Sequence, residues 1–151
     1  MLVREIVQLK GASVYTATPS QTLLDAIAHM ADLDAGSLIV MDDGRMVGVL
    51  TFREVLRALK NAGTAATDLR VADVMVKDPV TAFPDMEAND LRRLMIEKHS
   101  RYLPVVEGDT LLGVISFLDV AKAVLEEQSF ENKMLKNYIK NWPEEGAPHG
   151  G

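Results

Sequence analysis

Twice in this chain a hydroxyl residue is followed three positions later by an acid, each time directly after a glycine and two aliphatic residues. The first pair is Thr51 and Glu54, and the second, 65 residues further along, is Ser116 and Asp119. The apolar residues before each hydroxyl predict a buried strand, and the acid begins a predicted helix. N–H groups at a helix N-terminus suit a phosphate, and a carboxylate can accept hydrogen bonds from ribose hydroxyls. Each pair is therefore a candidate ligand site.

Helix capping is the alternative explanation for these pairs. Hydroxyl and acidic residues are common at helix N-termini, where their oxygens accept hydrogen bonds from free backbone N–H groups. For one copy alone, capping is the better explanation. Two copies in the same register favour a shared binding function.

The repeat extends without gaps well beyond the two pairs. Thr16 aligns with Thr81 and Pro19 aligns with Pro84 at the same offset. An internal repeat of this kind predicts two copies of one supersecondary unit, each needing the other to cover its apolar face.

Hydrophobic spacing predicts the same β-α-β-β-α order in both copies. The expected strands are residues 14–17, 37–41, 46–50, 80–83, 102–106 and 111–115, and the expected helices are residues 23–33, 54–61, 88–99, 119–127 and 130–142. Ser20 and Asp85 are the expected starts of the first helix in each copy. The chain therefore belongs to the α/β (α+β) class, with two pseudo-symmetric units packed as a pair and a C-terminal helix.

The composition shifts along the chain predict five regions. They are a first unit (1–62), a small and polar linker (63–70), a second unit (71–127), a C-terminal helix (128–142) and a disordered tail (143–151). The C-terminal helix carries an apolar stripe that needs a docking surface, either on a partner chain or on its own module.

The amino-acid composition excludes several classes of function. The chain has 151 residues, 48% of them hydrophobic, a net charge of −6 and no cysteine. Disulfides, thiolate metal sites and a cysteine nucleophile are therefore excluded. We expect a soluble cytoplasmic protein, because there is no signal-peptide pattern and no apolar run near the roughly 20 residues that span a membrane. The acidity argues against nucleic acid as the main partner.

No catalytic constellation is visible. His29, His99 and His149 are scattered, and no two of them share ligand spacing with a carboxylate, so we expect no metal site. The chain also lacks a P-loop and a Ser-His-Asp order. We therefore expect no catalytic residues and no enzymatic activity.

The repeated glycine–hydroxyl–acid stretches resemble the cystathionine-β-synthase (CBS) domain family, specifically a tandem pair known as a Bateman module. The segments 71–75, 80–81 and 101–106 also resemble that family, and the likeness runs from about Arg4 to Glu127. The resemblance implies two pseudo-symmetric clefts between the units, usually binding AMP, ADP or ATP. S-adenosylmethionine or a dinucleotide is a less common ligand.

The resemblance also implies roles for individual residues. The acid would accept hydrogen bonds from ribose and the hydroxyl residue would lie near the phosphates, which points to Ser116 with Asp119 and to Thr51 with Glu54. Because Glu54 replaces the family's usual Asp, we expect its cleft to be the weaker one. The positions implied to hold the base are Gly36, Ser37, Leu38, Val71, Met75, Thr81, Tyr102, Leu103 and Pro104.

Two arginines lie beside these positions in the sequence. Arg101 precedes the strand at 102–106 and Arg53 follows Thr51, so either could bind a phosphate through two parallel hydrogen bonds. A solvated surface arginine is the equally good alternative for both. Tyr102 could stack on a base or fill the interface between units.

The function expected on these grounds is that of a nucleotide-responsive regulatory module. The resemblance implies a homodimer formed through the closing helices, and possible partners are a regulated enzyme or transporter. Two alternatives remain: an assembly module with vestigial clefts that binds no ligand, and an enzyme that uses the cleft for hydrolysis.

Overall fold

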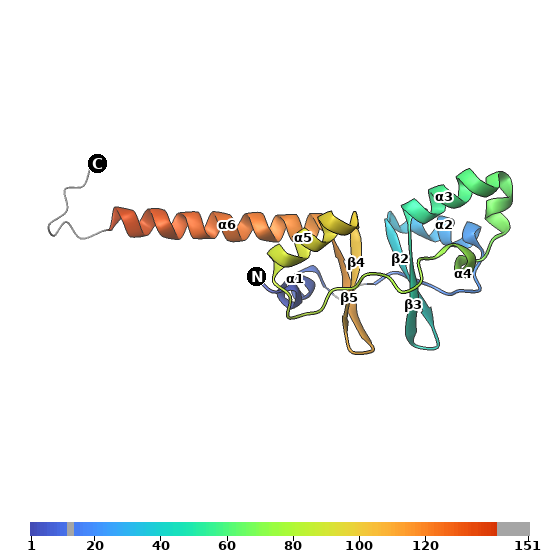
Figure 1. Cartoon of the computed structure of the whole chain (residues 1–151), viewed down its shortest axis with the longest axis horizontal. Helices are drawn as coiled ribbons and strands as arrows, with labels where there is room; N and C mark the ends of the chain where they lie inside the picture. The colour runs from blue at the N-terminus through green and yellow to red at the C-terminus, as the bar shows by residue number, and fades with distance from the viewer. Residues whose placement is uncertain (12–13, 142–151) are drawn as a thin grey trace.

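Two similar α+β units lie side by side, and one long helix projects away from them (Figure 1). The computed structural model describes residues 1–11 and 14–141, so the predicted tail 143–151 lies outside the described residues. The first unit contains β1 (Thr16–Ala17), α2 (Leu23–Leu33), β2 (Ser37–Asp42), β3 (Arg45–Thr51) and α3 (Phe52–Ala62). The second contains α5 (Ala88–Lys98), β4 (Tyr102–Glu107), β5 (Thr110–Ser116) and α6 (Phe117–Lys140).

The predicted internal repeat is present in the strand register. β2 pairs antiparallel with β3 so that Ser37 lies opposite Thr51, and β4 pairs with β5 so that Tyr102 lies opposite Ser116. Both ladders shift register at the same repeat position, between residues 40 and 41 and between 105 and 106. The first strand of each unit is shorter than predicted. β1 has two residues, and its counterpart is a single parallel bridge between Ala82 and Val105.

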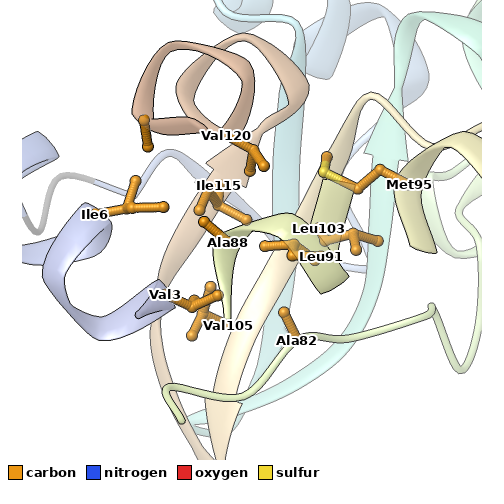
Figure 2. Close-up of a cluster of buried hydrophobic side chains, with 11 residues drawn as sticks. Val3, Ile6, Ala82, Ala88, Leu91, Met95, Leu103, Val105, Ile115 and Val120 are labelled. Atoms are coloured by element: carbon orange, nitrogen blue, oxygen red, sulfur yellow. The ribbon is translucent and has the colours of Figure 1, made fainter. Parts of the chain in front are cut away.

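Each unit is completed by a helix that precedes the other unit in the sequence. Helix α1 (Val3–Lys10) buries Val3 and Ile6 in the core of the second unit, against residues of α5, β4 and β5. Figure 2 shows these two side chains among Ala88, Val105 and Ile115. Helix α1 therefore lies in the first predicted region (1–62) by sequence, while its apolar face packs on the core of the second unit.

The first unit receives the reciprocal helix, α4 (Val71–Val74). Val71 is fully buried in the first core, and its N–H donates to the carbonyl of Gln21 at 2.8 Å. The segment predicted as a linker also belongs to this core. It forms a 3-10 helix, η1 (Gly63–Asp68), whose Ala66 is fully buried. Small residues predicted a linker here, but small side chains also allow the close packing of η1 against α3.

Two helix starts differ from the sequence prediction. Thr22, and not Ser20, caps α2, because its hydroxyl accepts a hydrogen bond from the Asp25 N–H at 3.1 Å. Helix α5 begins after Glu87, and not at Asp85. Asp85 pairs instead with Arg4, which ties α1 to the loop before α5.

The C-terminal helix is not a separate element. Helix α6 runs unbroken for 24 residues, so the predicted helix 130–142 is the continuation of the closing helix of the second unit. Val120 and Ala123 are buried on the second core, whereas every residue from Gln128 to Asn141 is exposed. The distal half of α6 therefore projects past the body of the molecule (Figure 1).

Candidate functional site

Both hydroxyl–acid pairs lie where a strand ends and a helix begins, as the sequence predicted. Thr51 is the N-cap of α3 and Ser116 is the N-cap of α6. Both side chains therefore make the capping interactions that were the alternative explanation. The two carboxylates nevertheless have different surroundings.

Glu54 is a nearly buried carboxylate with a neutral partner. Its side chain is 8% exposed, and the Thr51 hydroxyl donates to its Oε1 at 2.9 Å and its Oε2 at 3.1 Å. Within the described part of the chain, Glu54 makes no salt bridge. A carboxylate offers about four lone-pair sites, and a single hydroxyl uses only part of that capacity. Glu54 therefore remains able to accept hydrogen bonds from a ligand.

This pair lines a cleft of about 470 Å³ between the two units. The volume is within the range of small-molecule sites. The first unit contributes Thr51, Phe52, Arg53, Glu54, Leu56 and Arg57, and the second contributes His99 to Pro104. Val76, Pro79 and Val80, from the segment that joins the units, complete the apolar part of the wall. We call this the Glu54 cleft.

Asp119 has a cationic partner inside the protein. The Lys10 ammonium donates to Asp119 Oδ2 at 2.7 Å and to the Val114 carbonyl at 3.0 Å, and the Ser116 N–H donates to the same Oδ2 at 3.0 Å. Partial burial alone would raise the pKa of Asp119, but the hydrogen bonds from Lys10 and Ser116 and the Lys10 charge outweigh it. The pKa of this carboxyl therefore lies below its ordinary value.

A second, more open cleft of about 800 Å³ lies beside this pair. Its wall includes Lys10, Gly36 and Ser116, but not Asp119. Lys10 comes from α1, the helix that completes the second unit, so its ammonium already binds the Asp119 carboxylate. We call this the Lys10 cleft.

The two clefts share one wall. Arg53 and residues 99–102 line both of them. The Arg53 guanidinium donates to the carbonyl of His99, so it links α3 of the first unit to the loop that follows α5 of the second. Arg57 and Arg101 also line the Glu54 cleft and make no salt bridge within the described residues. This cleft is therefore locally cationic in an acidic chain, which suits an anionic ligand.

Tyr102 fills the space beside Gly36. A Cβ atom at Gly36 would lie 2.0 Å from the Tyr102 hydroxyl oxygen, which is too close for any side chain. Tyr102 lines both clefts and is half-buried, so it both packs at the interface and faces the ligand spaces.

Five of the predicted base-binding residues line neither cleft. Val71 and Leu38 are fully buried in the first core, and Met75 packs against Gly48. Ser37 and Thr81 also lie outside both walls. The buried positions were chosen by family resemblance, but their side chains point into the core and not between the units.

The structure adds residues that the sequence analysis missed. Arg57, Val76, Pro79 and Val80 line the Glu54 cleft, and Lys10 lines the other. The repeat offset could have identified Lys10, because it aligns with Met75, a residue already proposed for the site.

In residues 1–11 and 14–141, no three His, Asp or Glu side chains are placed to hold a metal ion. Across the same residues, none of the helices combines the length and apolarity that crossing a membrane requires.

Comparison with known proteins gives relatives along most of the chain. The CBS domain-containing protein CBSX3, mitochondrial, of Arabidopsis thaliana is 26% identical over 147 residues, covering 91% of this chain and 71% of its own. The CBS domain-containing protein YhcV of Bacillus subtilis is 30% identical over 117 residues, covering 77% and 82%.

Solved structures share the fold. The CBS-domain containing protein ATU1752 from Agrobacterium tumefaciens superposes with a TM-score of 0.78 at 29% identity, over 82% of this chain and 98% of its own. A putative signal-transduction protein with CBS domains from Burkholderia ambifaria gives 0.78 at 30%, over 85% and 96%. The hexameric CBS-CP12 protein from bloom-forming cyanobacteria gives 0.70 at 28%, over 80% and 69%.

The model of the CBS domain matches this chain twice, at residues 3–61 and 71–126. Each match begins with α1 or α4 and ends in the closing helix of the following unit. In the folded chain, however, α1 packs on the second unit and α4 packs on the first. Pairs of such domains are commonly regulatory parts of proteins. The chain belongs to the CBS domain family, as a tandem pair of the domain.

Proposed function

We propose that this chain is a regulatory module that binds an adenine nucleotide in the Glu54 cleft. The observation that carries the proposal is the Glu54 carboxylate, which is 8% exposed, has only the Thr51 hydroxyl as a partner within the described residues and lines the cleft. Burying a charged group without a cation is costly unless hydrogen bonds compensate. The two hydroxyls of a ribose supply such hydrogen bonds.

The rest of the wall fits the other parts of a nucleotide. Arg53, Arg57 and Arg101 present guanidinium groups at the cleft, and guanidinium groups bind phosphate oxygens through paired hydrogen bonds. Val76 and Val80 are exposed apolar side chains on the same wall. Covering them with the flat face of a base removes apolar surface from water.

The ranking of the clefts is the reverse of the one that the sequence favours. The family-like pair of Ser116 and Asp119 looked intact, but Lys10 already neutralises Asp119 at 2.7 Å. A ribose would have to displace this ammonium before it could reach the acid. The longer Glu54 side chain has no such competitor, so the Glu54 cleft is proposed as the principal site.

Binding in this cleft would act on the arrangement of the two units. The ligand would contact α3 of the first unit and residues 99–104 of the second, where Arg53 already donates to the His99 carbonyl. A ligand shifts a conformational equilibrium by its difference in affinity for the two states. A nucleotide that touches both units therefore favours one arrangement of them, and this supplies the regulatory signal.

Self-association is the second part of the proposal. The helices carry exposed apolar side chains, among them Leu24, Leu56, Ile96 and Leu125. The related CBS-CP12 protein is described as hexameric. We expect this chain to form at least a homodimer through these helices, and to pass the nucleotide signal to an enzyme or transporter. This chain is similar to a region that makes up 34% of arabinose 5-phosphate isomerase KdsD of Yersinia pestis, so an enzyme can carry a region of this kind.

The test is calorimetric titration of AMP, ADP and ATP into Glu54→Gln. Removing the charged acceptor should cost roughly 1.5–3 kcal/mol for each ribose hydrogen bond, so affinity should fall at least about tenfold. Glu97→Gln, an exposed acid on α5, is the matched control and should bind as the parent does. Equal affinity in both variants would refute the role of Glu54. Absence of binding by the parent to all three nucleotides would favour an assembly module whose clefts are empty.

A further inference from the structure

The distal half of α6 lies beyond the residues that the CBS domain model matches. The family match ends at residue 126, and helix α6 continues to Lys140. At about 1.5 Å per residue, its 24 residues give a rod about 36 Å long, of which the part after Glu127 touches neither core. A helix segment of this length is marginal in water without a packing surface.

One side of this helix carries exposed apolar side chains at seven-residue spacing, interrupted by Gln128 and Asn132. Leu118, Leu125 and Ile139 are spaced at seven or fourteen residues and are 76%, 65% and 61% exposed. Asn132 lies in this seven-residue series between Leu125 and Ile139. Leu135, which is 57% exposed, lies three residues after Asn132. These are the a and d positions of a coiled-coil seam, which we call the α6 seam. Val120 and Ala123, buried in the second core, lie on a different side of the helix.

We infer that the α6 seam pairs with the same seam of a second copy of this chain, parallel and in register. The charges beside the seam select this occupant. Glu131 precedes Asn132 and Lys136 follows Leu135, so these are the g and e positions. In a parallel, in-register pair, each Glu131 lies beside the Lys136 of the other copy, five residues further along. An antiparallel pair would instead bring like charges together.

The residues within the seam favour the same arrangement. Asn132, at an a position, contacts Asn132 of the second copy only when the two helices are parallel and in register. A single asparagine at an a position specifies the register and the two-stranded state. In the last heptad, Leu135 at d and the β-branched Ile139 at a are also the combination that favours two strands. The apolar pair of Phe130 and Met134 lies on the other side of the helix, where no charge pattern selects a partner.

This inference does not depend on nucleotide binding, and the absence of native cysteine gives it a direct test. Leu135→Cys and Gln128→Cys each place one thiol at a d position, and Lys133→Cys places one on the polar side as the matched control. All three positions are exposed in the single chain, so the substitutions should not disturb the fold. The readout is the rate of disulfide-linked dimer formation in the full chain under mild oxidation.

We expect both seam variants to cross-link with themselves faster than the control by about 100-fold at about 10 µM protein, because paired helices raise the effective thiol concentration to the millimolar range. Adding Glu131→Lys to Leu135→Cys should slow cross-linking, and adding Lys136→Glu as well should restore it. Equal cross-linking rates for Lys133→Cys and Leu135→Cys would overturn the inference. Cross-linking between positions 128 and 135, without cross-linking of either to itself, would overturn the parallel register.

Discussion

Replacing Lys10 by Met should open the cleft beside Ser116 and Asp119 to a second nucleotide. Methionine is the residue that the repeat places at the equivalent position, Met75, so the substitution introduces the uncharged residue of the other repeat. It removes the ammonium that donates to Asp119 Oδ2 at 2.7 Å and to the Val114 carbonyl at 3.0 Å. The carboxylate then becomes available to ribose hydroxyls.

The structural cost of this substitution should be small. The Lys10 and Asp119 side chains are 37% and 28% exposed, so water screens the pair. Partly exposed ion pairs contribute up to about 1 kcal/mol, and we expect a loss of that order in the free energy of unfolding at neutral pH. The Ser116 N–H still caps Asp119 at 3.0 Å, so α6 should remain formed.

The pH dependence of this loss identifies its origin. In the folded chain the pKa of Asp119 is held below its ordinary value, so its interactions stabilise the fold above the unfolded-state pKa, about 3.9 for an aspartate. That contribution is lost as the pH falls through the folded pKa. The difference in stability between the parent and Lys10→Met should therefore be full at neutral pH and should vanish in strong acid.

Two measurements check this reasoning. Urea denaturation of both proteins from pH 7 into strong acid, below the folded pKa of Asp119, gives the stability difference, and calorimetric titration with adenine nucleotides gives the stoichiometry. We expect about one nucleotide per chain for the parent and about two for Lys10→Met. A difference in stability that is independent of pH, or an unchanged stoichiometry together with an unchanged Asp119 pKa, would refute the assignment of Lys10 as the competing cation.

Two further predictions concern the packing of the units. Ile6→Ala should destabilise the chain by about 2–5 kcal/mol, because Ile6 is 5% exposed in the second core, and native-state hydrogen exchange should show the loss in β4 and β5. A loss confined to the first unit would contradict the exchange of helices. Gly36→Ala should cost about 1–3 kcal/mol through its clash with Tyr102, and Tyr102→Ala in the same chain should recover part of it by thermal melting. A fully additive double variant would contradict that contact.

The sequence was sufficient to predict the repeated part of the fold. Alternating and helical hydrophobic spacing identified β2, β3 and α2 within a residue or two, and the glycine before each hydroxyl–acid pair marked the strand-to-helix junction. Comparison with the CBS family confirmed both the class and the tandem arrangement. These features depend on local patterns, and local patterns are what a sequence displays most directly.

The contents of the candidate site could not be predicted so well. Lys10 reaches Asp119 across 109 positions of sequence, and no local pattern shows such a contact. Arg57 lies one helical turn after Arg53, so its position at the cleft depends on which face of α3 packs toward the second unit. The buried state of Glu54 likewise results from tertiary packing.

The exchange of α1 and α4 makes the two units parts of one folding event. Cutting the chain between the two sequence repeats, after residue 62, would leave α1 on the first fragment and α4 on the second, while the cores that need them would be on the opposite fragments. Each fragment alone would expose an unfilled core and carry a helix with no place to pack. Mixed together, the fragments should complement each other, because every missing helix is then supplied. The intact chain is accordingly expected to unfold in a single cooperative transition, with no state in which one unit survives without the other.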